Sequence, residues 1–337
     1  MSLDHILPAS ATTSSAPDSQ FLPGTSLQYA WDSVSLTNIL ACPRRYQYSI
    51  IHGLVPKATG FAIALEFGIL FHSGLEQYHN VRASFDHDRA VHSAVRRVVT
   101  DPAFSRLPVA DDIEEMKEAH DPDEDDGITF RNSKIRTRYH LIRAIVWYLE
   151  HYADDPAQTF VLPSGRPAVE LSFRVPLDLP GVEHPILLCG HIDRVAVFND
   201  SLFVSDYKTT KSLTSQFFAM FDLSHQMTGY ISAGQVILSE PVKGSIVDGV
   251  ALQVGGVKFG RAVTRRTPGQ INEYFQTLTL ANTLALRFHA DNWYPMNTSS
   301  CYFCDFREVC RQPPEYRERF IAQHYHSKRG WNPLANR

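Results

Sequence analysis

The chain has 337 residues, of which 44% are hydrophobic and 20% charged, with a formal net charge of −4. This is the composition of a soluble globular protein, and no apolar run approaches the roughly 20 residues that a transmembrane helix needs, so we expect no membrane association. Five cysteines without a secretory signal indicate a reducing, cytoplasmic location and argue against a disulfide framework.

The first 28 residues are rich in Ser, Thr, Ala and Pro and lack hydrophobic periodicity. They predict a disordered leader, followed by a single domain over residues 29–337. The domain is expected to begin with a short helix after Ser33. Cys42 follows in the segment Ala-Cys-Pro-Arg-Arg-Tyr. Taken alone, this cysteine would most simply be a buried free thiol ahead of a helix.

Residues 62–78 have the apolar pattern of a helix, which His72 interrupts one turn after Gly68. A lone histidine on an apolar helix face is more often a hydrogen-bonded core residue than a ligand. Residues 80–165 predict a mainly helical insertion broken by a solvated acidic loop, since ten of the 36 acidic residues lie between positions 111 and 127. The rest of the chain has a net positive charge, which would suit a basic groove.

Residues 186–208 predict two strands joined by a tight Asn-Asp turn. Asp206 and Lys208 share one face of the second strand, because residues i and i+2 point the same way, and the first strand brings Asp193 beside them. Two carboxylates next to a lysine make an oxygen-rich site for a divalent metal ion, and Mg²⁺ uses such carboxylates together with substrate phosphates. The alternative is a surface hairpin with incidental charges.

The next predicted helix carries Gln226 and Tyr230, whose i, i+4 spacing puts both on one face. Residues 247–254 predict a further strand and residues 268–290 a long helix. Between them, residues 255–266 read as a Gly-rich basic turn, which would either lie along DNA or serve as an ordinary hairpin loop.

A cysteine-cluster segment is predicted over residues 293–312, where three cysteines have the spacing Cys-x-x-Cys-x-x-x-x-x-Cys. They are Cys301, Cys304 and Cys310. Cys42 supplies a fourth thiolate from the other end of the chain. Four thiolates suit Zn²⁺ or an iron–sulfur cluster, and the spacing does not choose between them. The fifth cysteine, Cys189, is expected to be a buried core thiol.

Gly190-x-x-Asp193, a hydrophobic strand and then Asp206-x-Lys208-Thr resemble the core of the PD-(D/E)XK nuclease superfamily, in particular its RecB-like branch. The resemblance extends from about residue 33 to residue 312. It implies an α/β, restriction-endonuclease-like fold, in which a mixed sheet of about four or five strands is flanked by helices. The helical insertion and a C-terminal four-cysteine staple would be additions to this core.

The resemblance also implies a role for each polar residue of the pattern. Ligands for Mg²⁺ or Mn²⁺ would be His72, Asp193, Asp206 and the main-chain carbonyl of Tyr207. Residues acting on the scissile phosphate would be Asp193, Asp206 and Lys208. DNA would be contacted by Gln226 and Tyr230. Glu170, in a strand predicted over residues 167–175, would support the site without contacting the metal, or else is an exposed strand residue.

The four cysteines resemble the [4Fe–4S] staple of CRISPR-associated exonucleases and of the AddB subunit, with zinc as the alternative. The function implied is that of a metal-dependent DNA exonuclease. It would act on single-stranded DNA or on free ends, alone or with recombination or CRISPR-adaptation proteins. Two alternatives are a catalytically silent DNA-binding or recombination subunit and a zinc-stapled nuclease. The intact set of metal and catalytic residues argues against a silent subunit.

Overall fold

The computed structural model describes residues 19–57, 62–109, 135–253, 255–327 and 331–335. The predicted acidic loop and residues 1–18 of the predicted leader lie outside these ranges. No helix within the described ranges has both the length and the hydropathy to cross a bilayer.

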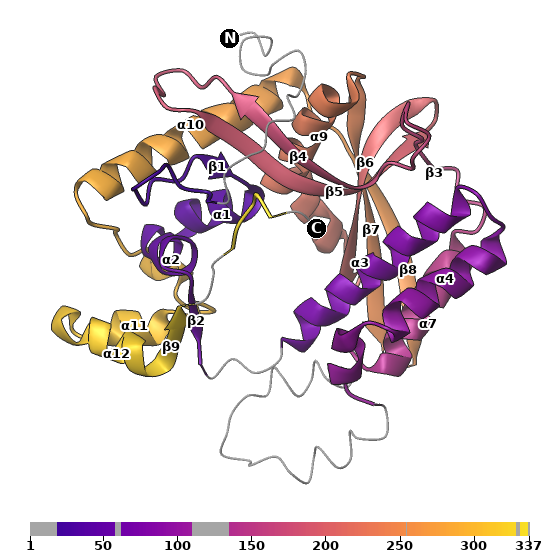
Figure 1. The fold of residues 1–337 in the computed structure, drawn as a ribbon, viewed down its shortest axis with the longest axis horizontal. Coiled ribbons are helices and arrows are strands. Elements are labelled where there is room, and N and C mark those ends of the chain that lie inside the picture. Colours follow the sequence, from indigo (N-terminus) through magenta and orange to yellow (C-terminus); the bar gives the residue numbers. More distant parts are fainter. Residues whose placement is uncertain (1–18, 58–61, 110–134, 254, 328–330, 336–337) are drawn as a thin grey trace.

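A seven-stranded mixed sheet forms the centre of the molecule (Figure 1). Its central path runs β1-β5-β6-β7-β8, and β3 and β4 also pair with β5. The strands are β1 (Ala30–Trp31), β3 (Gln158–Thr159), β4 (Val169–Leu177), β5 (Ile186–Phe198), β6 (Ser201–Thr210), β7 (Val242–Gln253) and β8 (Gly256–Thr264). Strands β5 and β6 are antiparallel, whereas β6 and β7 are parallel and require the crossover through helices α8 (Ser215–Asp222) and α9 (His225–Leu238).

Helices cover both faces of this sheet. One face packs on α1 (Ser33–Ala41), α9 (His225–Leu238) and α10 (Pro268–Ala290). The other face packs on α3 (Ile63–Arg82), α4 (His87–Val99) and α7 (Arg138–His151). Helix α8 (Ser215–Asp222) leads into α9. The protein is therefore a mixed α/β protein, consistent with the predicted restriction-endonuclease-like fold.

Local sequence explains why these elements form where they do. The β5–β6 hairpin turns through Asn199 and Asp200, which have φ angles of 49° and 55°. Asparagine and aspartate tolerate this left-handed conformation, so the predicted turn is confirmed. Helix α10 begins as predicted, because Thr267 caps it, Pro268 occupies its first turn and Gln270 completes a capping box.

Two features of the sheet differ from the prediction. It has seven strands rather than four or five, because β1 and β3 are two residues long and leave no periodic pattern in the sequence. Residues 255–266 were expected to form a basic turn, but most of them form strand β8. Arg261 in this strand forms ion pairs with Asp155 and Asp248, so its positive charge is neutralised within the protein.

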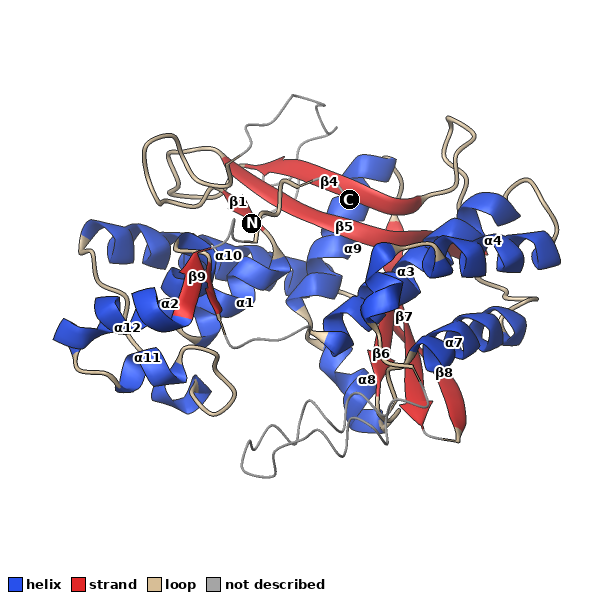
Figure 2. Cartoon of the chain, turned by 60° about the horizontal axis from the view of Figure 1, so that its bottom comes forward, coloured by secondary structure: helices blue, strands red, loops and turns tan. Residues whose placement is uncertain are grey.

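Two segments that are far apart in the sequence meet in a second substructure, the cysteine lobe. It comprises Cys42 with α2 (Pro43–Tyr46) and β2 (Leu54–Pro56), together with residues 297–306, α11 (Arg307–Arg311), α12 (Arg317–His324) and β9 (Tyr325–Ser327). Strands β2 and β9 pair in a two-stranded antiparallel sheet, which the sequence did not predict. Figures 1 and 2 both show these elements side by side, away from the part of the sheet formed by β6, β7 and β8.

Candidate metal centre

The candidate site lies where β5 and β6 separate. Their paired residues run from Phe198–Ser201 to Arg194–Ser205, and the ladder stops there. The next positions along the two strands are Asp193 and Asp206. We call this point the strand fork, and Figure 2 shows β4 and β5 running away from β6 and β7. Both predicted carboxylates are thus placed at the opening of the sheet, and both are buried.

The side-chain alternation of β5 breaks at the strand fork. Ile192 and Val195 both belong to the core under α9, although two residues lie between them. The intervening Asp193 and Arg194 both reach the α3 side, where Asp193 pairs with a histidine and Arg194 lies over an aromatic ring. Such an irregularity aims two neighbouring side chains in one direction, as bulges beside active sites do.

Glu170 shows a matching irregularity on β4. The β4–β5 ladder pairs Val169 and Leu171 but leaves out Glu170, which is the position opposite Asp193. Glu170 has a φ of 46°, in the left-handed region that a glutamate rarely adopts. A conformation of this kind costs about 1–3 kcal/mol and persists where surrounding structure enforces it, often at functional sites.

His72, Glu170 and Asp193 form the group that could hold a metal ion. Each offers one ligand atom, and these atoms all lie within 4.8 Å of one another. His72 Nδ1 is 3.2 Å from Asp193 Oδ2. One imidazole nitrogen and two carboxylate oxygens suit a divalent cation such as Mg²⁺, and the imidazole somewhat favours Mn²⁺. The residues present therefore fit the predicted metal. Glu170 is itself a candidate ligand in this group, whereas the sequence analysis expected it to support the site without contacting the metal.

The main chain of Tyr207 ties two of these residues together. Its N–H donates to Asp193 Oδ2 at 3.1 Å, and its carbonyl accepts from His72 Nε2 at 2.9 Å. The side chain of Asp193 thus takes the place of a strand partner where β5 has moved away. The carbonyl of Tyr207, a predicted ligand, faces the same histidine.

Asp206 and Lys208 form an ion pair at the same opening. Lys208 Nζ is 2.6 Å from Asp206 Oδ2, and the Asp206 side chain is only 2% exposed. Asp206 is not part of the compact three-residue group, but it is close enough to shift the pKa of His72. The structure therefore brings all four predicted side chains to one place, while pairing Asp206 first with the lysine.

The charges of this cluster are strongly coupled. Burial alone would lower the pKa of His72, but the Asp193 carboxylate outweighs it and raises the pKa to about 9. Burial disfavours ionised Asp193, yet His72 and then Lys208 hold its pKa below the ordinary value. Burial raises the pKa of Asp206, and the charge of Asp193 adds to the effect. Crowded, buried carboxylates of this kind are the donor set that a divalent cation stabilises.

The model of the PD-(D/E)XK nuclease superfamily matches residues 33–311, which include the whole strand fork. The chain belongs to this superfamily. Membership implies a nuclease, a hydrolase of phosphodiester bonds.

Comparisons with individual proteins add little to this assignment. The crystal structure of SSO0001 matches this nuclease with 13% identity and a TM-score of 0.29, over 62% of this chain and 81% of that one. Protein VC1899 from Vibrio cholerae matches with 12% identity and a TM-score of 0.17, over 71% of this chain and 61% of that one. No curated protein matches this nuclease.

Gln226 and Tyr230 lie together in the first turns of α9, and Gln226 Nε2 donates to the Tyr230 hydroxyl at 3.0 Å. The Tyr230 ring packs edge-on against Phe173. Both rings cover Gly190, where an added Cβ would come within 2.7 Å of Phe173 and 3.0 Å of Tyr230. The glycine of the Gly-x-x-Asp motif is thus required by close packing beneath the strand fork.

Asn297 connects the first cysteine of the chain to the C-terminal trio. Its N–H donates to Cys42 Sγ at 3.4 Å, and its carbonyl accepts from Cys301 Sγ at 3.7 Å. Burial raises the pKa of the Cys304 and Cys310 thiols, and Cys42 is close enough to contribute to both shifts. Within the described ranges, however, the four cysteines do not form a group as compact as that at the strand fork.

The fifth cysteine is separate from this set, as predicted. Cys189 lies on β5, is 2% exposed and packs with Tyr29, Ala30 and Leu334. Burial raises the pKa of its thiol strongly, which keeps it protonated and unreactive.

Two residues close to the site were missed by the sequence reasoning. Arg194 follows the motif aspartate directly, and its guanidinium lies 6.0 Å from the centre of the Tyr207 ring. His79 stands seven residues after His72 on α3 and shares a hydrogen bond with the Tyr207 hydroxyl. The i, i+7 spacing of the two histidines was the available signal, since such positions share a helix face.

Proposed function

We propose that this chain is a metal-dependent deoxyribonuclease and that it acts as an exonuclease. The observation that carries the proposal is the arrangement at the strand fork. His72, Glu170 and Asp193 offer three ligand atoms within 4.8 Å of one another, and the Asp206–Lys208 ion pair lies beside them. A structural role alone does not require buried carboxylates, an imidazole and an ammonium group at the open end of a sheet.

His72, Glu170 and Asp193 would hold Mg²⁺ or Mn²⁺, with Asp206 and the Tyr207 carbonyl as the further predicted ligands. When bound, such an ion polarises the scissile phosphate and lowers the pKa of a water molecule. Lys208 keeps its ammonium group at the site because Asp206 holds it. Its positive charge would orient the attacking water and stabilise the charge that develops on the phosphate. Gln226 and Tyr230 would contact the DNA beside this centre.

The cysteines would form a separate, structural [4Fe–4S] site, with zinc as the alternative. The support for this part is the placement of Cys42 against the segment that carries Cys301, Cys304 and Cys310. A four-iron cluster spreads its thiolates farther apart than a single zinc ion does, so cysteines that are near but not compact suit the cluster better.

A second candidate function is that of a silent DNA-binding subunit acting with recombination or CRISPR-adaptation proteins. It is disfavoured by the lysine. A subunit that only binds DNA would not need Lys208 Nζ at 2.6 Å from the carboxylate of Asp206, which is almost fully buried. The same assay therefore tests both candidates.

The test compares Lys208→Ala with Lys211→Ala, because Lys211 is an exposed lysine three residues further along the chain. Cleavage of single-stranded and duplex DNA is measured with Mg²⁺ and with Mn²⁺. We expect Lys208→Ala to lower the rate by about 10²- to 10³-fold and Lys211→Ala to leave it unchanged. A wild-type protein that binds DNA but cleaves neither substrate with either metal would support the silent subunit instead.

A further inference from the structure

Two histidines of α3 hold the two ends of one tyrosine. His72 Nε2 donates to the main-chain carbonyl of Tyr207 at 2.9 Å, and His79 Nε2 shares a 3.1 Å hydrogen bond with its phenol oxygen. The histidines are seven residues apart, which is close to two helical turns, so both face β6. Tyr207 is therefore bonded to the same helix through its backbone and through its side chain.

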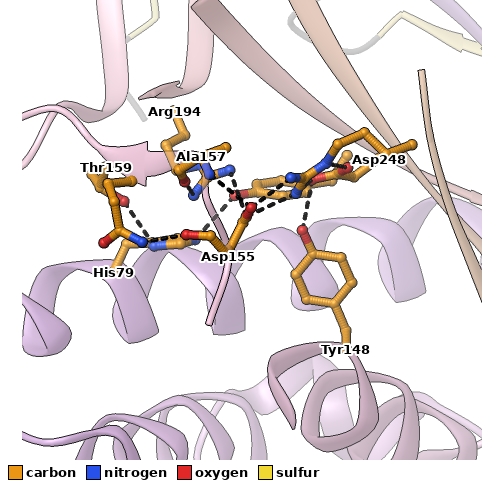
Figure 3. Close-up of polar contacts among 10 residues, drawn as sticks. His79, Tyr148, Asp155, Ala157, Thr159, Arg194 and Asp248 are labelled. Atoms are coloured by element: carbon orange, nitrogen blue, oxygen red, sulfur yellow. Dashed lines mark hydrogen bonds and ion pairs between the residues drawn. The ribbon is translucent and has the colours of Figure 1, made fainter. Parts of the chain in front are cut away.

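His79 is itself fixed in place. Its Nδ1 atom lies 3.0 Å from Thr159 Oγ1, and Figure 3 shows this contact between β3 and α3. Its ring lies parallel to that of Tyr207, with an interplanar angle of 11°. Burial, and then the nearby charge of Arg194, lowers the pKa of His79 well below its ordinary value. The neutral ring has one donor and one acceptor nitrogen, and both have partners here.

The other contacts of Tyr207 lead to the metal centre. Its backbone N–H donates to Asp193, a candidate ligand, and the guanidinium of Arg194 lies over its ring. Its side chain is completely enclosed, and the ring also meets the edge of Tyr148. A movement of this ring would thus change the positions of the groups that face both His72 and Asp193.

We propose that Tyr207, His79 and Thr159 form a clamp that sets the position of α3 against the sheet, and thereby the distance between His72 and Asp193. This inference rests on the proposed metal-dependent function. His79 and the hydroxyl of Tyr207 act as positioning groups and do not touch substrate or metal.

The need for such a clamp follows from where the candidate ligands originate. His72 comes from a helix, Glu170 from β4 and Asp193 from β5, so no single element fixes their spacing. A slip of α3 by one residue would move His72 about 1.5 Å along the helix axis. Metal–ligand distances tolerate only about 0.2 Å. Packing of apolar side chains permits small slips of a helix, whereas two directed hydrogen bonds to one residue do not.

Tyr148 provides a matched control for the hydroxyl of Tyr207. It is also a buried tyrosine, and its hydroxyl donates to Asp248 at 2.7 Å in the neighbouring network of Figure 3. Tyr148→Phe and Tyr207→Phe each remove one buried hydroxyl and keep the ring. Both should lower the thermal midpoint, but only the second loses a bond in the clamp.

The experiment measures Mn²⁺ binding to the full-length protein by calorimetry without DNA, together with the thermal midpoint. We expect Tyr207→Phe and His79→Leu each to weaken Mn²⁺ binding by about 10- to 100-fold, as changes behind metal ligands typically do. The double variant should be no weaker than His79→Leu alone, because that variant already breaks the bond to Tyr207 as well as the bond to Thr159. Tyr148→Phe should bind Mn²⁺ as the wild type does.

Wild-type Mn²⁺ affinity in Tyr207→Phe would overturn the clamp while leaving the nuclease proposal intact. So would additive losses in the double variant, because they would mean that the two residues act independently. If the wild type binds no Mn²⁺ and shows no metal-dependent cleavage, the proposed function fails and the clamp fails with it. If Tyr148→Phe loses as much Mn²⁺ affinity as Tyr207→Phe, general destabilisation explains both losses, and the clamp is overturned.

Discussion

The strand fork and the cysteine lobe both collect side chains of types that can bind metals, from distant parts of the chain, but they hold them differently. At the strand fork the ligand atoms of His72, Glu170 and Asp193 are already within 4.8 Å of one another. They are attached to regular elements and bonded to the main chain of Tyr207. In the cysteine lobe the four thiols are near one another, and Asn297 in a short connecting segment links two of them.

The difference indicates what each proposed metal would do. At a site that regular elements arrange in advance, the ion does not have to build the fold and is free to act on a substrate. A site built on short segments gains order when its ligands close around a metal, so binding and folding become one equilibrium. We therefore expect metal removal to stop activity at the strand fork and to loosen structure at the cysteine lobe.

The lobe is nevertheless tied by more than its cysteines. Arg44 donates from its backbone to Pro295 and from its side chain to Tyr294, and strand β2 pairs with β9. These contacts join segments that are far apart in the sequence. Loss of the proposed cluster should accordingly weaken the lobe while the central sheet remains folded.

The largest expected effect is on the cysteines. Replacing Cys42, Cys301, Cys304 or Cys310 by Ser should remove the brown colour of protein purified without air, reduce solubility and lower the thermal midpoint by about 5–10 °C. Visible absorbance, iron content and calorimetry measure these changes.

Cys189→Ser is the control, since this buried thiol lies apart from the four. It should keep its colour. If the wild-type protein is colourless and contains stoichiometric zinc, the iron–sulfur proposal is wrong and the four cysteines form a zinc site. Full colour in any of the four variants would remove that cysteine from the ligand set.

The next effect concerns His72 and tests whether the strand fork is arranged in advance. His72→Ala removes one of the three grouped ligand atoms and one bond to Tyr207. We expect the Mn²⁺ concentration that gives half-maximal cleavage to rise by at least about 10-fold. The opposite pattern, a large loss of thermal stability with unchanged metal dependence, would make His72 a core residue.

Much of the strand fork could be predicted because its chemistry is local in sequence. The hairpin turn fixes which residues of β5 and β6 oppose each other, and a period of two places Asp206 and Lys208 on one face. Gly190 belonged to the predicted motif, although its close packing against Phe173 and Tyr230 emerged only from the structure. Long helices such as α3 and α10 were also predictable from their apolar pattern and caps.

What could not be predicted depends on long-range contacts or on broken patterns. The two-residue strands β1 and β3 exist because β5 is there to pair with them. The left-handed conformation of Glu170 has no sequence signal, since glutamate ordinarily avoids it. The basic residues of β8 looked suited to DNA, yet Arg261 is paired with the buried Asp248 and the partly buried Asp155. A charged residue in a sequence does not reveal whether its side chain faces the solvent or a partner inside the protein.

The smallest expected effect is a pH dependence that distinguishes the two sites in the absence of divalent metal. Asp193 outweighs burial and raises the pKa of His72 from its ordinary 6.5 to about 9. The folded protein therefore binds this proton more tightly than the unfolded chain does. The resulting stabilisation is fully present below about pH 6.5 and is lost as the pH rises through about 9.

The measurement is the thermal midpoint of wild type and His72→Gln in a chelator that spares the cysteine site, between pH 6.5 and pH 9. The advantage of the wild type should shrink steadily across this range, because glutamine cannot carry the proton. Cys304→Ser serves as the control, since its deficit does not depend on His72 and should not follow the same course. A wild-type advantage that stays constant with pH would mean that the His72–Asp193 pair is not charged in the metal-free protein. In that case the carboxylates of the strand fork would be balanced by Lys208 alone, and metal binding would not have to displace a proton from His72.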